Sequence, residues 1–174
     1  MSRFFSLLLV GLVFTAITSC GDDDDTFVFS EDVLVGTWNV DDLSGDGSVT
    51  ATVLGQSESS TVEVVTDNST ATITFTSSPN EFTSAGSITV TSTETSSGTM
   101  DSTTETSPAF GSGTWRVVNA TTLEVTDQGE TTVFTVDPSS SSNSLVLVNE
   151  IDESIDLFGT TIRTVLTTTT RLTR

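Results

Sequence analysis

The sequence predicts an all-β domain, either an antiparallel up-and-down barrel of about 8–10 strands or a β-sandwich. Apolar and polar side chains alternate with a period of two, as in Ala71, Ile73 and Phe75 with Thr between them. Turn-forming residues recur at spacings of roughly 8–14 positions, and apolar repeats of helical period are almost absent. Half-buried strands joined by short turns explain all three observations.

Each predicted strand is a run of alternating or β-branched residues between turn signals. Further strands are expected at 35–43, 48–54, 61–66, 81–93, 114–119, 122–125, 131–137, 144–149 and 162–172. Turns are expected at 44–47, 67–68, 78–80, 111–113, 127–129 and 138–143. Segments 56–60 and 95–107 are too polar for a core and are predicted to be long loops or projecting hairpins, and 151–158 a short helical turn.

Length and composition indicate one acidic domain. The 174 residues include no Lys and no His, about a third are Ser or Thr, and the net charge is −19. Nucleic-acid binding needs clustered basic side chains, so this composition argues against it, and also against docking to anionic lipid by charge. The composition suits a soluble domain in a medium where salt screens self-repulsion.

The first 19 residues have the pattern of a secretory signal peptide: Arg3, an apolar run to about Thr15, and small residues before Cys20. The apolar run is too short for a membrane-spanning helix, which needs about 20 residues. The stretch 17–20 (Ile-Thr-Ser-Cys) resembles the lipobox of bacterial lipoproteins. That resemblance implies cleavage before Cys20 and attachment of the mature protein to a membrane by acyl chains on Cys20. An ordinary signal peptide cut elsewhere is the alternative.

Residues 20–32 are expected to form an acidic tether, because Gly21 is followed by four Asp. Loss of Arg3 with the leader leaves 4 Arg against 24 carboxylates, which takes the net charge from −19 to about −20. Acidic runs directly after a lipidated cysteine resemble a signal that exports lipoproteins to the cell surface in one Gram-negative phylum. The expected location is therefore the outer membrane, facing the medium, with the periplasmic face as the alternative.

The predicted domain at 33–174 contains the motif Gly-Thr-Trp-x-Val twice, at 36–40 and at 113–117. With the Thr-Leu-Glu-Val strand at 122–125, this pattern resembles the lipocalin-like domains of bacterial lipoproteins. The resemblance implies an eight-stranded barrel that holds a small apolar ligand. It also implies that an Arg of the last strand, Arg163 or Arg171, stacks on Trp38.

Four aromatic residues are the candidate ligand contacts: Trp38, Phe75, Trp115 and Phe134. The alternative for both Trp residues is packing in the core without a ligand. No cofactor or metal site is expected. The segment 41–47 has oxygen ligands for Ca²⁺ but lacks the final Glu of an EF-hand loop, so a hairpin turn is the better interpretation.

Catalysis is not expected. Without His or Lys the chain has no Ser-His-Asp triad and no Schiff-base lysine, and Cys20 is assigned to lipid. A pair of carboxylates among Glu124, Glu130, Glu150 and Asp152 is the remaining option for glycoside hydrolysis. The leading hypothesis is a ligand-binding or interaction module, and the alternative is an adhesin-like or carbohydrate-binding β-sandwich.

Overall fold

The computed structural model describes residues 27–108 and 110–174. The predicted leader at 1–19, Cys20 and the acidic run at 22–25 lie outside the described residues. One short helix, α1 (Glu31–Leu34), precedes an otherwise all-β chain. The strands are β1 (Gly36–Val53), β2 (Gln56–Ser69), β3 (Thr72–Thr76), β4 (Glu81–Ala85), β5 (Ser87–Ser96), β6 (Thr99–Pro108), β7 (Ser112–Asn119), β8 (Thr122–Asp127), β9 (Glu130–Val136), β10 (Ser144–Leu157) and β11 (Thr160–Thr173).

Eight of the strands close into an antiparallel barrel, which confirms the predicted lipocalin-like fold class. Around the barrel the order is β1, β3, β4, β7, β8, β9, β10 and β11, and β11 pairs back onto β1. Strands adjacent around the barrel are therefore consecutive along the chain, except that β2, β5 and β6 leave it. A single closed sheet replaces the two packed sheets that the sandwich alternative required.

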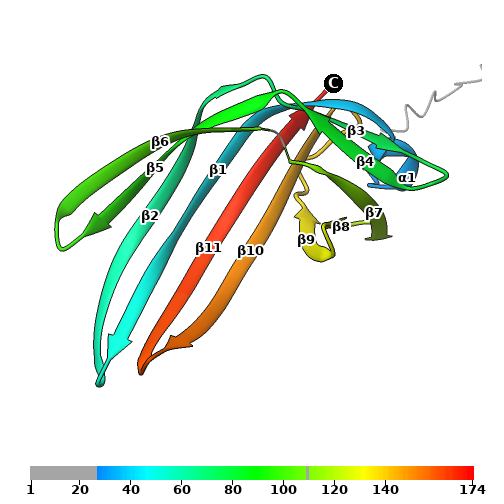
Figure 1. Ribbon diagram of the computed structural model, residues 1–174. Helices are drawn as coiled ribbons and strands as arrows, with labels where there is room; N and C mark the ends of the chain where they lie inside the picture. The colour runs from blue at the N-terminus through cyan, green and yellow to red at the C-terminus, as the bar shows by residue number, and fades with distance from the viewer. Residues whose placement is uncertain (1–26, 109) are drawn as a thin grey trace, which may run out of the picture.

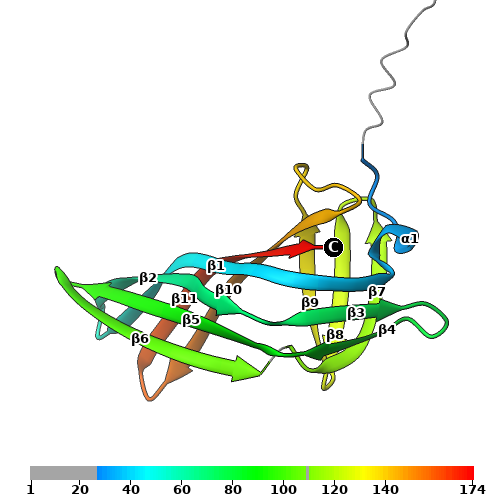
Figure 2. The same ribbon diagram turned by 90° about the horizontal axis from the view of Figure 1, so that it is seen from above.

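The barrel is complete only at one end of the molecule, because β8 and β9 are short (Figures 1 and 2). Beyond them, β1, β10 and β11 continue as long strands, and β2, β5 and β6 extend the same sheet. Six strands in the order β10, β11, β1, β2, β5, β6 thus form an open, curved continuation of the barrel. Their inward faces are continuous with the barrel interior.

The turn predicted at 44–47 is wrong, because β1 runs through it as one strand. Its two glycines serve close strand packing rather than a turn. A Cβ on Gly47 would collide with the Val165 carbonyl of β11, and a Cβ on Gly45 would lie 3.1 Å from the Thr167 carbonyl. Glycine at these positions lets β1 and β11 approach where the sheet coils.

Three further segments also turn out to be strands. The short helix predicted at 151–158 is wrong, because β10 covers 151–157, and there Ile151 and Ile155 share the inward face. Segment 56–60 is part of β2 rather than a loop, and 95–107 falls almost wholly in β5 and β6, which form a projecting hairpin of the kind predicted. Hydroxyl pairs such as Thr91 with Thr104 join its outward face at 2.7 Å.

The core is densest at the closed end of the barrel. Trp38 is fully buried, and its indole N–H donates to the Leu34 carbonyl of α1 at 2.8 Å. Phe29 is also buried, so the chain packs against the barrel before the domain boundary predicted at 33. Among the described residues, no helix is long and apolar enough to cross a membrane.

An arginine does stack on Trp38, but it is Arg174, with its guanidinium carbon 4.3 Å from the ring centre. The predicted Arg163 and Arg171 are excluded by strand alternation, since Leu172 faces inward and odd-numbered neighbours face outward. Arg163 instead pairs with Asp152 on the outer surface at 2.7 Å.

A tight turn at Pro138, within the segment predicted as a turn, orders the connection between β9 and β10. The Asp137 carboxylate accepts a hydrogen bond from the Ser139 backbone N–H at 2.8 Å. Hydrogen bonds from Ser139 hold the pKa of Asp137 below its usual value.

Candidate functional site: an apolar pocket in the barrel

The two Gly-Thr-Trp motifs frame a pair of phenylalanines. Across four neighbouring strands, one row of paired residues reads Gly36, Phe75, Phe82, Gly113. The two rings lie 6.2 Å apart between two positions without side chains, and Phe75 also makes an edge contact with Trp115 at 6.1 Å. Gly113 lets the Phe82 ring lie against its backbone, since a Cβ there would come within 3.0 Å of that ring, and the Phe side chains form one wall of a pocket.

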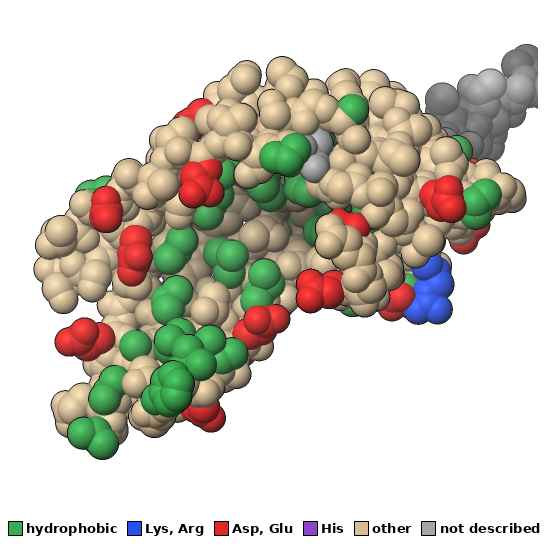
Figure 3. All heavy atoms as spheres, in the orientation of Figure 1, with side chains coloured by type: hydrophobic (Ala, Val, Ile, Leu, Met, Phe, Trp, Pro, Cys, Tyr) green, Lys and Arg blue, Asp and Glu red, His purple; other side chains and the backbone are tan. Residues whose placement is uncertain are grey.

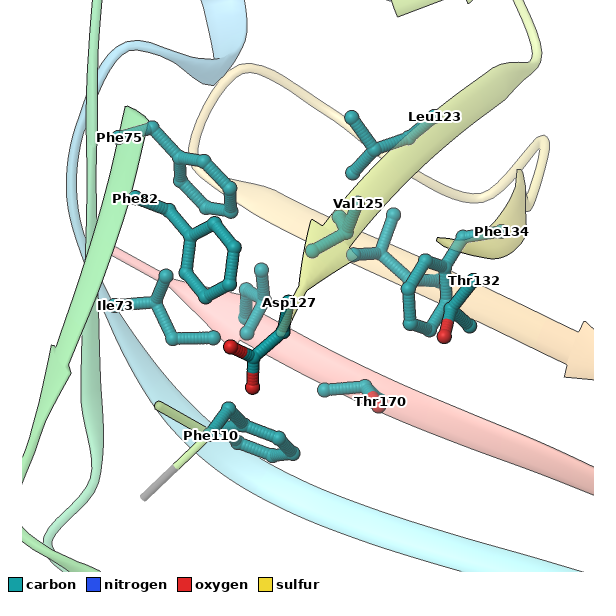
Figure 4. A pocket seen from close by; sticks show the side chains of 12 residues that line it. Ile73, Phe75, Phe82, Phe110, Leu123, Val125, Asp127, Thr132, Phe134 and Thr170 are labelled. Atoms are coloured by element: carbon teal, nitrogen blue, oxygen red, sulfur yellow. The ribbon is translucent and has the colours of Figure 1, made fainter. Parts of the chain in front are cut away.

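The pocket has a volume of about 310 Å³. Figure 4 shows its walls, with Phe75 and Phe82 on one side and Val125 and Phe134 on the other. Phe110 and Thr132 are exposed at its mouth. The complete lining is Ile73, Phe75, Phe82, Phe110, Leu123, Val125, Asp127, Thr132, Phe134, Leu147, Thr170 and Leu172.

Asp127 is the charged residue of this lining. It ends β8, and its carboxylate points into the space near Ile73 and Phe110 (Figure 4). Within the described residues, its carboxylate makes neither an ion pair nor a hydrogen bond, and no basic side chain lines the pocket. An apolar chamber with one unpaired carboxylate favours a ligand that brings a positive charge or a hydrogen-bond donor.

The structure places the four predicted contacts in two groups. Phe75 and Phe134 line the pocket, from β3 and β9. Trp38 and Trp115 do not line it, because each indole is buried in the wall of the barrel with its N–H bonded to backbone carbonyls. The Trp115 N–H donates to both Thr76 and Glu81 at 3.0 Å, which ties β7 to the hairpin that carries Phe75.

Sequence reasoning missed several lining residues. Phe82 stands between Glu81 and Thr83, just after a predicted turn. Its place in the pocket follows from the pairing of β4 with β7, which sets it opposite Gly113 of the repeated motif. Leu123 and Val125 were assigned to a strand by alternation, and the same alternation places Asp127 on their face. Phe110 follows β6 outside the regular strands, and no sequence pattern marks it.

None of the carboxylates considered for glycoside hydrolysis is in the pocket lining, although Glu130 of β9 pairs across the strands with Asp127. Glu124 pairs with Arg116 on the outside of the barrel, and Asp152 pairs with Arg163. None of the carboxylates in 27–108 or 110–174 is buried, and in these ranges no three acidic residues are grouped as metal ligands. No protein-family model and no curated protein matches the chain.

Proposed function

We propose that this protein is a lipid-anchored envelope lipoprotein whose lipocalin-like barrel binds a small apolar molecule with a cationic or hydrogen-bond-donating end. The pocket supports the proposal: about 310 Å³, walled by aliphatic and aromatic side chains, with the Asp127 carboxylate facing inward. Pockets for small molecules have volumes of about 300–1,000 Å³, so the ligand belongs at the small end of that range.

The neutral dye N-phenyl-1-naphthylamine, which brightens in apolar surroundings, is the first probe. Val125→Trp fills the pocket, whereas Val133→Trp changes the next strand on its outer face, where Val133 is 48% exposed. We expect Val125→Trp to weaken dye binding at least tenfold and Val133→Trp to leave it within twofold. Equal binding by the two variants, or no binding by the unaltered protein, would contradict the proposal.

The carboxylate makes a second, sharper prediction about ligand charge. Decylamine should displace the dye at concentrations at least tenfold lower than decanoate, because only the amine offers a positive charge to Asp127. Asp127→Asn should reduce that preference to less than threefold while dye binding persists. A preference for decanoate would contradict a role for Asp127 in selecting the ligand.

The membrane anchor is a separate proposal that rests on the sequence 17–20. Intact-mass analysis of membrane-extracted protein should find a chain that starts at an acylated Cys20, and Cys20→Ala should release the protein to the soluble fraction. Protease treatment of whole cells then distinguishes the cell surface from the periplasm. An unacylated chain in the soluble fraction would rule out the anchor.

A further inference from the structure

The open half of the sheet carries an apolar face that nothing in the described residues covers. Strand pairing puts the same face of β10, β11, β1, β2, β5 and β6 toward the inside, and we call this concave surface the trough. One row crosses all six strands: Glu153, Thr164, Val49, Ser60, Ser96 and Thr99. The apolar residues of the trough are Val49, Ala51, Val53, Val62, Val64, Ile151, Ile155, Leu157, Ile162 and Leu166.

These apolar side chains gather in the hollow seen in Figure 3, over β1, β10 and β11. Ile155 is 52% exposed and Leu157 48% exposed, and Leu166 is partly buried. The opposite face of the same strands is lined mostly by Thr, Ser and carboxylates, which is the composition expected for contact with water. Strands that contact only water on this face would need no apolar side chains there. The apolar face of the trough therefore indicates a surface that another molecule covers.

All charges of the trough are negative. Its carboxylates are Glu58, Glu94, Asp101, Glu105 and Glu153. Glu94 and Asp101 stand directly opposite each other on β5 and β6, a like-charge pair that destabilises a sheet unless a cation lies between them. The four Arg of the described chain lie elsewhere, on the outer surface or at the closed end.

The size of the trough fits a helix. Six strands at about 4.8 Å spacing span about 24 Å, and the nine paired residues of β1 and β2 span about 30 Å. A helix is about 10–12 Å wide with side chains, and 18 residues are about 27 Å long. Because the trough is concave, a helix can contact it over about half its circumference, which gives about 450 Å² per partner, at the low end for a specific complex.

We propose that the trough binds a basic amphipathic helix of a partner protein, with the apolar face of the helix on Leu166 and Ile155 and its Lys or Arg residues between Glu94 and Asp101. A second copy of this acidic chain is disfavoured by repulsion between the two sets of carboxylates. A flat bilayer cannot follow a concave surface, and acyl chains carry no positive charge to pair with the carboxylates of the trough.

The test uses an 18-residue fluorescent amphipathic Leu/Lys peptide, a scrambled peptide of the same composition without an apolar face, and a Leu/Glu amphipathic peptide. Fluorescence anisotropy should give binding of the Leu/Lys helix at least tenfold tighter than of either other peptide. Equal binding of the scrambled peptide would mean charge attraction alone and would overturn the proposal. So would preferred binding of the Leu/Glu peptide.

Matched variants locate the binding surface. Leu166→Thr alters the trough, and Val165→Thr alters the adjacent residue on the outer face. We expect Leu166→Thr to weaken binding of the Leu/Lys peptide at least fivefold and Val165→Thr to weaken it less than twofold. Glu94→Gln with Asp101→Asn should weaken binding at least threefold and flatten its salt dependence, whereas Glu63→Gln on the outer face should not.

Two controls separate this proposal from its rivals. The dye should bind the trough variants as it binds the unaltered protein, which shows that they are folded and keeps the pocket proposal independent. Sedimentation of the protein alone should find a monomer. Sedimentation with vesicles of zwitterionic lipid should find the protein unbound. A dimer dissociated by Leu166→Thr, or vesicle binding lost in that variant, would assign the trough to a second copy or to lipid and overturn the helix proposal.

Discussion

Arg174 closes the barrel over Trp38, and its removal gives a measurable prediction. Its guanidinium lies 4.3 Å from the indole centre, and it also donates to the carbonyls of Ser142 at 2.9 Å and Val35 at 3.2 Å. A cation–π contact contributes about 0.5–1 kcal/mol at an exposed site, and each exposed hydrogen bond adds about 0.5 kcal/mol or less after the entropy of ordering the side chain. Arg174→Ala should therefore lower the free energy of unfolding by about 0.5–2 kcal/mol.

Equilibrium unfolding in urea, followed by tryptophan fluorescence, measures this change. The midpoint should fall while the slope with urea stays constant, because the folded surface is nearly unchanged. Arg171→Ala is the matched control, since it removes the same charge from the outer face of β11, the strand that Arg174 follows, and it should shift the free energy of unfolding by less than about 0.5 kcal/mol. Arg174→Lys keeps the charge but loses the planar stacking group, so its change in the free energy of unfolding should lie between those of the two alanine variants. Equal effects of Arg174→Ala and Arg171→Ala would refute a stabilising role for the contacts of Arg174 with Trp38, Ser142 and Val35.

Three other changes test the packing and electrostatics. Gly47→Ala forces a Cβ against the Val165 carbonyl and should cost about 1–3 kcal/mol in urea unfolding, more than Gly45→Ala, whose neighbours need to shift only slightly. Leu54 is 95% exposed at φ 50°, so Leu54→Asn should raise the thermal midpoint, because Asn tolerates that conformation better. Hydrogen bonds from Ser139 lower the folded pKa of Asp137, so its stabilising effect is present above pH about 4 and lost as the pH falls through the folded pKa. Asp137→Asn should be less stable than the parent at pH 7, and the difference should shrink as the pH falls below about 4.

The all-β fold class follows from patterns that are local in the sequence. Alternation along 71–75 and 122–125 assigned strands, and the repeated Gly-Thr-Trp motif indicated the barrel and two of its buried indoles. The same local reasoning misplaced a turn at Gly45 and Gly47, because glycine beside Asp and Ser is a turn signal whenever the neighbouring strand is not known. Only the proximity of β11 explains why glycine is needed there.

The pocket lining also contains residues that the sequence predicts and residues that only strand pairing reveals. Phe75 and Phe134 were foreseeable because each is a large apolar residue on the inward face of a predicted strand. Phe110 and Thr170 were not, since one follows a strand that leaves the barrel and the other lies in a run of four Thr. Their place in the lining depends on which strands meet around the barrel, and that pairing joins residues far apart in the chain.

The sequence by itself determined the all-β class, the acidic character and the alternation of side chains in the strands that it predicts, because these depend on composition and a two-residue period. Only the tertiary structure decided that the barrel closes at one end and opens into an apolar trough at the other. The physical reason is strand length: β8 and β9 stop where β1, β10 and β11 continue. The consequence of that mismatch appears only when the strands are assembled side by side.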